Sequence, residues 1–221
     1  MRRPVAKSKR EPLDPLFREA LQTATQDTDA TGQRILEGAL ALLEDFGLRR
    51  MTIEDVARRA RMSRVTIYRR FAGKDALVRA VLLRELRRFF AAIDEAVSGI
   101  EATEDRLVEG FAFALQFLHE HALLNRFLRT EPELLLPYLT VDAGPVLDAA
   151  RQFLAERLEQ EIDEGRLAPI DVQVTGELLA RLVLSFFLTA HSVVPLATPD
   201  EARRFARVYL APALRAASAD A

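Results

Sequence analysis

The stretch MSRVTIYRRF, residues 62–71, combines three arginines with the hydroxyls of a serine, a threonine and a tyrosine, groups that contact phosphates and base edges. In a helix, Ile67 and Phe71 are four residues apart and share one face, so both apolar side chains can pack inward. The outward face then carries Arg64, Val65, Thr66, Tyr68 and Arg69. The pattern predicts a short helix that is held by its apolar side and presents a basic, hydroxyl-bearing side to a duplex.

The outward residues differ in what they can contact. Arg64 lies near the start of this predicted helix, where helix-turn-helix proteins place base-reading groups, and a guanidinium can pair with O6 and N7 of guanine. Val65 offers an apolar contact to a thymine methyl, and the hydroxyls of Thr66 and Tyr68 suit phosphate oxygens. A merely solvated arginine face, with a half-buried Tyr68, is the alternative interpretation of the same residues.

Two further predicted helices position this segment. Residues 31–46 carry one apolar stripe, and Gly47 is expected to end that helix. Thr52 begins the second helix with a capping-box pattern, and the apolar pattern of this helix breaks at Arg61. Ser63 then caps the short third helix. A short helix, a tight turn and a second short helix form the helix-turn-helix arrangement, whose second helix enters the major groove.

Charge is distributed unevenly along the 221 residues, although the net charge is only −2. Residues 1–75 hold 16 basic and 11 acidic residues, a charge of +5, and residues 76–221 hold 15 and 22, a charge of −7. Residues 49–74 alone carry nine Lys and Arg against two acidic residues. This asymmetry predicts an anionic partner at one end of the molecule.

Composition excludes several classes of protein. The chain has no cysteine, so disulfides and thiolate metal sites are excluded. His119 and His121 are two residues apart and leave a helix on different sides, so we expect no metal site and no cofactor. A nucleophile with a plausible partner, a glycine-rich phosphate loop and a two-histidine metal motif are all missing, so we do not expect an enzyme.

The sequence predicts neither secretion nor membrane insertion. The N-terminus lacks the apolar core of a secretory signal. The longest uncharged run, residues 182–199, contains several polar side chains and is expected to be a buried helix. We therefore expect a soluble, cytoplasmic protein with no membrane partner.

Apolar residues recur at three- and four-residue steps along most of the chain, and strand signals are weak. The chain is therefore predicted to be all-α, with about nine helices. After the first three, helices are expected near residues 74–97, 103–121, 123–129, 131–139, 144–165, 171–194 and 199–217. A short helix is also conceivable near residues 16–23.

Residues 31–77 resemble the N-terminal domain of the TetR family of transcriptional repressors. The matching stretch is TIEDVARRARMSRVTIYRRFAGKDALV, residues 52–78, and its most telling parts are Thr52, Ala57, Thr66-Ile67-Tyr68, Phe71 and Lys74. The resemblance implies an all-helical homodimer that binds double-stranded DNA. It implies backbone contacts from Thr52, Ser63, Thr66, Tyr68 and Lys74, and base-facing positions for Arg64, Val65 and Arg69.

One position departs from the family pattern. The family's turn often has glycine where this chain has Arg61, and a non-glycine residue in a left-handed conformation costs on the order of 1 kcal/mol. Either the turn differs or Arg61 accepts the strain, and Arg61 becomes an additional candidate for phosphate contact. At Lys74 a phosphate at the helix N-terminus would suit both the free amides and the lysine, but a solvent-facing lysine is the alternative.

The resemblance also implies a division of the chain. Residues 1–30 are expected to form a flexible basic arm, residues 31–77 the helix-turn-helix domain, and residues 78–221 a helical regulatory and dimerisation domain. The arm either enters a minor groove or remains a disordered tail with weak nonspecific attraction. The helices near 171–194 and 199–217 are implied to form the interface with a second copy, so that the operator is roughly palindromic.

A small-molecule pocket among the middle helices is implied as well, and its ligand is expected to be apolar or amphipathic. Candidate lining residues are Phe111, Phe117, His119, Phe127, Tyr138, Phe153, Phe187 and His191, and further polar candidates are Asn125, Arg126, Ser185 and Thr189. The alternative is that these phenylalanines are plain core. A ligand-independent architectural DNA-binding protein and a helical interaction module are the other functions left open.

Overall fold

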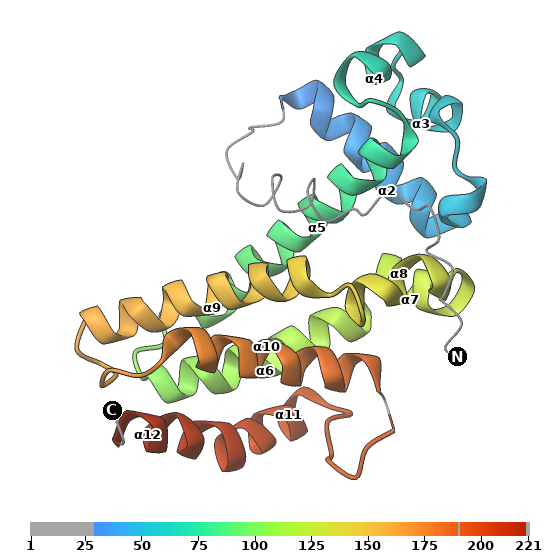
Figure 1. Cartoon of the computed structure of the whole chain (residues 1–221). Coiled ribbons are helices and arrows are strands. Elements are labelled where there is room, and N and C mark those ends of the chain that lie inside the picture. Colours follow the sequence, from blue (N-terminus) through green and yellow to red (C-terminus); the bar gives the residue numbers. More distant parts are fainter. Residues whose placement is uncertain (1–28, 190, 220–221) are drawn as a thin grey trace, which may run out of the picture.

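The structure, a computed structural model, describes residues 29–189 and 191–219, and these residues form helices without strands (Figure 1). The helices are α2 (Ala30–Arg50), α3 (Ile53–Ala60), α4 (Arg64–Arg70), α5 (Lys74–Val97), α6 (Thr103–Glu120), α7 (Ala122–Thr130), α8 (Pro132–Leu139), α9 (Gly144–Asp163) and α10 (Val172–Leu188). A last continuous helix consists of α11 (Pro199–Phe205), the π-helical turn η1 (Ala206–Leu210) and α12 (Ala211–Ala219). The predicted all-α class is confirmed, with ten helices in the described part of the chain against about nine expected.

Helices α2, α3 and α4 are grouped at one end of the molecule, and α5 passes from this group into a larger set of helices (Figure 1). We call α2–α4 the head and α6–α12 the body. Within the body, α9 packs along α10, and α6 packs against α5, α10 and α11. The long helix α5 is therefore shared by the head and the body.

The head is built around the inward face of its three helices. Ile67 of α4 is fully buried, and Phe71, half-buried at the end of that helix, packs against the same cluster, as the sequence predicted. The cluster also includes Leu123 and Phe127 of α7 and Leu135 of α8. The head core is thus continuous with part of the body, so a movement of α7 or α8 reaches the head directly.

Helix α2 changes direction at Gly47, whose φ of 79° and ψ of 173° are not helical. The expected end at this glycine is therefore correct for the regular helix, although a further helical turn continues to Arg50. A backbone conformation of this kind is almost restricted to glycine.

Helix α10 ends at Leu188, six residues before the predicted end at residue 194. Thr189 has φ −120° and ψ 89°, and His191 and Ser192 lie in a loop that reaches Pro195. The prediction therefore extended this helix too far. Proline disfavours a helical conformation in the residue before it, which accounts for residue 194 but not for the end at Leu188.

The expected division of the chain stays a prediction. The boundary between residues 77 and 78 falls inside α5, whose Val78 and Val81 belong to the head core. The expected basic arm and the short helix near 16–23 lie outside the described residues, except for Asp29 and Ala30.

Candidate DNA-binding surface and ligand cavity

The turn between α3 and α4 is left-handed at Arg61, with φ 55° and ψ 46°. The amide of Met62 donates to the carbonyl of Ala57 at 2.9 Å, which closes the end of α3. Of the two possibilities raised by the sequence, Arg61 therefore accepts the strained conformation. Its side chain is exposed beside the start of α4.

Hydroxyl caps fix the starts of α3 and α4. The Thr52 hydroxyl accepts from the amide of Asp55 at 3.2 Å and donates to its carboxylate at 2.6 Å, which lowers the pKa of Asp55. The Ser63 hydroxyl accepts from the amide of Thr66 at 3.1 Å and lies 2.9 Å from the Thr66 hydroxyl. Both caps orient short helices that would be marginal alone.

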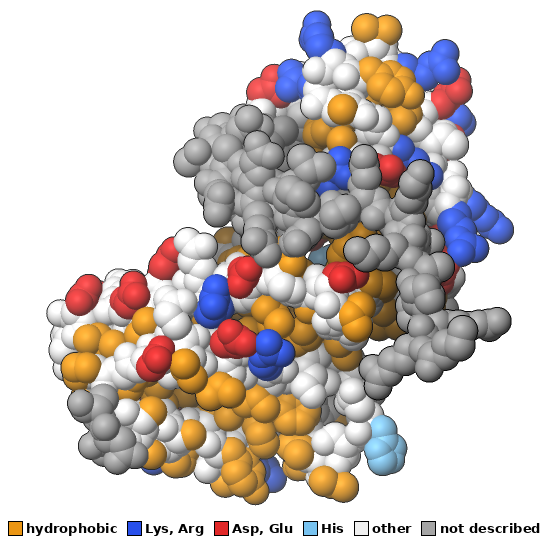
Figure 2. Space-filling view, in the orientation of Figure 1, with side chains coloured by type: hydrophobic (Ala, Val, Ile, Leu, Met, Phe, Trp, Pro, Cys, Tyr) orange, Lys and Arg blue, Asp and Glu red, His pale blue; other side chains and the backbone are white. Residues whose placement is uncertain are grey.

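The outward face of α4 is open. Val65 is 76% exposed and Tyr68 is 57% exposed, which is unusual for such large side chains in a chain with a formed core. Arg64 is also exposed, and its guanidinium lies 3.5 Å from the carboxylate of Glu54, an ion pair that competes weakly with any external anion. Lys and Arg side chains project from the head in Figure 2.

All nine expected DNA-contacting residues lie on consecutive pieces of the head or at the start of α5. Seven are exposed: Thr52, Arg61, Ser63, Arg64, Val65, Tyr68 and Arg69. Thr66 and Lys74 are half-buried, and Lys74 begins α5 directly after Gly73, whose φ is 111°. The chain thus brings a set of hydroxyls, cations and one exposed valine to a single end of the molecule.

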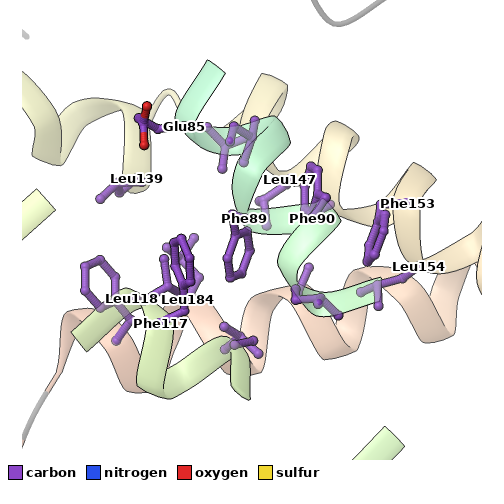
Figure 3. Close-up of a pocket in the computed structure, with 18 of the residues that line it drawn as sticks. Glu85, Phe89, Phe90, Phe117, Leu118, Leu139, Leu147, Phe153, Leu154 and Leu184 are labelled. Carbon is purple, nitrogen blue, oxygen red and sulfur yellow. The ribbon is translucent and has the colours of Figure 1, made fainter. Parts of the chain in front are cut away.

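A cavity of about 1600 Å³ lies in the body between α5, α6, α7, α8, α9 and α10, and it is larger than most small-molecule sites (Figure 3). Six of the eight expected lining residues do line it: Phe111, Phe117, Phe127, Tyr138, Phe153 and Phe187. Phe90, which the sequence analysis did not single out, stacks on Phe153 with ring centroids 4.6 Å apart. The lining is mainly aliphatic and aromatic.

The expected polar contacts do not reach the cavity. His119 is exposed on α6 and His191 is exposed in the loop after α10, and Asn125, Arg126, Ser185 and Thr189 also lie outside the lining. His121 and Glu85 line the cavity instead. Phe117 and His121 are four residues apart and share a face, but the spacing alone does not show which face meets the cavity.

Paired charges line other parts of the cavity. Arg157 makes two hydrogen bonds to Asp94, at 2.8 and 2.6 Å, and joins α9 to α5. Glu161 is buried and accepts hydrogen bonds from Arg166, Thr103 and Arg106, which lower its pKa to about 2. These carboxylates already have cationic partners.

One buried carboxylate connects the body to the head. Glu131, between α7 and α8, accepts a hydrogen bond from the amide of Leu48 at 2.7 Å and another from the amide of Arg49 at 2.9 Å. The break at Gly47 leaves these two amides free to be bound. Leu48 also lines the cavity, so the contact lies between the cavity and α2.

The fold and the open face of α4 define a helix-turn-helix DNA-binding protein with a larger helical body. Comparison with known families narrows this class. The family described as bacterial regulatory proteins, tetR family, matches residues 35–81, and the bacterial tetracyclin repressor, C-terminal domain, matches residues 102–209. The chain therefore belongs to the TetR family of transcriptional regulators.

Individual relatives agree with this assignment. An HTH-type transcriptional regulator of Mycobacterium tuberculosis is 28% identical over an alignment of 177 positions, which covers 77% of this chain and 83% of the relative. The regulator UidR of Escherichia coli K12 is 26% identical over an alignment of 166 positions, which covers 73% of this chain and 81% of UidR.

Solved structures show the same fold. The TetR family repressor AlkX of a Dietzia species superimposes with a TM-score of 0.61 and 25% identity, covering 84% of this chain and 95% of AlkX. Salmonella enterica GusR superimposes with a TM-score of 0.52 and 20% identity, covering 88% of this chain and 96% of GusR. No helix in the described part of this chain is long and apolar enough to cross a membrane.

Proposed function

We propose that this regulator is a ligand-responsive repressor that binds a roughly palindromic operator as a homodimer and is released by an apolar or amphipathic small molecule. The observation that carries the proposal is the large, mainly apolar cavity next to the head. AlkX, one of the structural relatives, is a repressor implicated in the biodegradation of n-alkanes. A DNA-binding regulator of this kind acts in the cytoplasm, where the chromosome lies.

In this proposal the nine exposed or half-buried residues of the head and of the start of α5 form the DNA contact. Arg64, Val65 and Arg69 face bases, whereas the hydroxyl-bearing residues and Lys74 contact phosphates. Arg61, held beside the start of α4, adds a phosphate contact. A resident metal or cofactor has no part in it.

Homodimerisation is proposed through α10 and the last helix. Val174 and Leu178 of α10, and Val208 and Tyr209 of η1, are each more than half exposed. Hydrophobic side chains gather over this lower part of the body in Figure 2. Large exposed apolar patches mark interaction sites, and a two-fold dimer would cover this one with its own copy.

Release is proposed to pass through Glu131. A ligand that displaces α7 or α8 moves Glu131, and the two hydrogen bonds to α2 then carry the movement to the head. A dimer whose heads stand at the wrong separation loses operator affinity by the coupling energy, typically about 1–3 kcal/mol.

Selection of bound duplexes from a random pool, with the purified full-length protein, tests the DNA side of the proposal. We expect a consensus of two inverted half-sites about one helical turn apart. Operator affinity is then measured with compounds that raise the melting temperature, and we expect a decrease of about 5- to 150-fold. If no bound compound changes the operator affinity, the protein is a ligand-independent architectural DNA-binding protein. If the protein has no affinity for duplex DNA at low salt, it is a helical interaction module.

A further inference from the structure

The two ends of the cavity differ in their polar groups. Glu85 and His121 lie at one end, and at the other the Asp94-paired guanidinium of Arg157 lies 4.9 Å from the ring centroid of Phe153. Glu85 lies at one end of the labelled side chains in Figure 3, and Phe153 and Leu154 lie at the other. Phe89 and Phe117 lie between these ends, with ring centroids 5.2 Å apart. A ligand that fills such a site along its length needs an apolar chain and one polar head.

The polar end is made by Glu85 and His121, whose side chains are 12% and 10% exposed. One carboxylate oxygen of Glu85 accepts hydrogen bonds from Arg84 and Arg88, both at 3.2 Å. The other oxygen accepts no hydrogen bond from a described residue and lies 3.7 Å from Nε2 of His121. Nδ1 of His121 is buried without a hydrogen-bond partner in the described part of the chain. The site therefore holds unused hydrogen-bonding capacity.

The charge at this end selects among possible heads. Burial by itself raises the pKa of Glu85, but the contact with His121 and the charges of Arg88 and Arg84 outweigh it, so the pKa is lowered and the carboxylate is ionised at neutral pH. An anionic head would meet an ionised carboxylate, which cannot donate a hydrogen bond to it. A cationic head would gain little net attraction, because Arg84 and Arg88 already balance the charge of the Glu85 carboxylate. Neither arginine lines the cavity.

We propose that Glu85 and His121 bind the uncharged, hydrogen-bond-donating head of a single-chain amphiphile, such as a long-chain alcohol, whose chain runs along Phe89 and Phe117 toward Phe153. This inference rests on the proposed function, because it names the class of effector that the same cavity takes. The ion pairs Asp94–Arg157 and Glu161–Arg106 of the lining are complete, whereas one oxygen of Glu85 accepts no hydrogen bond from a described residue.

Displacement of Nile red, a neutral lipophilic dye, from the full-length protein tests the inference with four probes that each carry an unbranched ten-carbon chain. These are decan-1-ol, decyl methyl ether, decanoate and decylammonium. We expect decan-1-ol to bind about tenfold more tightly than the ether, which cannot donate, and more tightly than either charged probe. Along a series of longer primary alcohols, affinity should rise about fourfold per added methylene until the chain fills the apolar part of the cavity.

Variants of Glu85 separate the head from the chain. Glu85→Leu should lower the ratio of alcohol to ether affinity to near one, and Glu85→Gln, which keeps an acceptor, should lower it less. If Glu85→Leu fails to fold because Arg84 and Arg88 lose their partner, the ratio in Glu85→Gln decides. Glu95→Gln, the same change at an exposed site on the same helix outside the lining, is the control and should keep the wild-type ratio.

The outcomes distinguish this inference from the proposed function. If all probes bind and weaken operator binding, but the alcohol has no advantage over the ether or Glu85→Gln leaves the ratio unchanged, the inference about the head is wrong and the repressor function stands. Tightest binding of decanoate or decylammonium overturns it as well. If no probe displaces the dye, or if no probe alters operator affinity, both the inference about the head and the proposed release by an amphipathic ligand are wrong for these ligands.

Discussion

At the scale of single residues, the direction of each α4 side chain decides whether it packs in the head core or is available to contact DNA. Ile67 is buried whereas Val65 and Tyr68 are exposed, although all three lie within one turn of helix. A substitution on the outward face should therefore alter DNA binding without unfolding the head. This expectation makes the base and phosphate contacts testable one at a time.

Arg64→Ala should relax the preference at one base pair per half-site and weaken binding to the preferred operator by roughly 1–3 kcal/mol, because a bidentate guanine contact is lost. Selection from a random duplex pool, compared with wild type, measures the change. An unchanged consensus would reject the assignment of Arg64 to a base.

Tyr68→Phe should weaken binding to all duplexes by a similar amount, about 0.5–1.5 kcal/mol, because only a hydrogen bond to the DNA backbone is lost. Fluorescence anisotropy with a consensus and a scrambled duplex provides the measurement. A loss confined to the consensus would instead place Tyr68 against a base.

Glu161 makes stability depend on pH. Its pKa is lowered from the ordinary 4.5 to about 2 in the folded protein, so its stabilisation is fully present above pH 4.5 and is lost as the pH falls toward 2. Glu161→Gln should lower the free energy of unfolding by up to about 3 kcal/mol at pH 7 and by much less near pH 2, measured by urea unfolding. Glu159→Gln, at an exposed site on α9, should show no such pH-dependent difference.

At the scale of elements, the break in α2 couples two helices of the body to the head. A Cβ at Gly47 would lie 2.8 Å from a carboxylate oxygen of Glu131, and the backbone there has a positive φ of 79°. Both the conformation and the contact therefore require glycine. The hydrogen bonds of Glu131 in turn hold the segment after the break.

Gly47→Ala should lower the free energy of unfolding by more than about 2 kcal/mol and speed hydrogen exchange at the amides of Leu48 and Arg49. Gly99→Ala is the matched control, because its φ is 77° and a Cβ there meets nothing within 4 Å. In the control, the free energy of unfolding should fall only by the cost of placing alanine in a backbone conformation with positive φ. Equal losses in the two variants would remove the contact with Glu131 from the explanation.

At the scale of the whole molecule, the described chain leaves an apolar surface on α10 and η1 uncovered. Leu178 is 58% exposed, and Tyr209 is 63% exposed although one side of its ring packs against Phe205. A palindromic operator needs two heads held at a fixed separation, so the proposed dimer interface is also a condition for tight DNA binding.

Leu178→Glu should convert the proposed dimer to a monomer and lower operator affinity at least tenfold, because each half-site then binds alone. Light scattering after size-exclusion chromatography measures the mass, and anisotropy measures the affinity. Leu136→Glu, an equally drastic change at an exposed leucine of α8, should leave the mass unchanged. A dimeric Leu178→Glu protein would place the interface elsewhere.

Local rules were enough to predict the helical class, the caps at Thr52 and Ser63 and the inward face of α4. Each depends on residues within about four positions of one another, which is the range of helix periodicity and capping. The predicted end of α10 was wrong because the apolar pattern continues past Leu188, whereas the backbone leaves the helical conformation at Thr189. Six of the eight phenylalanine and tyrosine residues that line the cavity were identified by type, without knowledge of their neighbours.

The sequence by itself determined the three-helix head, the direction of its reading helix and the presence of an apolar body, because these follow from periodicity and local hydrogen bonding. Only the tertiary structure decided that Arg61 takes the left-handed turn, that His121 and not His119 faces the cavity, and that Glu131 binds the amides of Leu48 and Arg49. These contacts join residues more than 80 positions apart or depend on how helices are rotated against each other. Spacing along a chain specifies which residues share a face, but the packing of several helices fixes what that face meets.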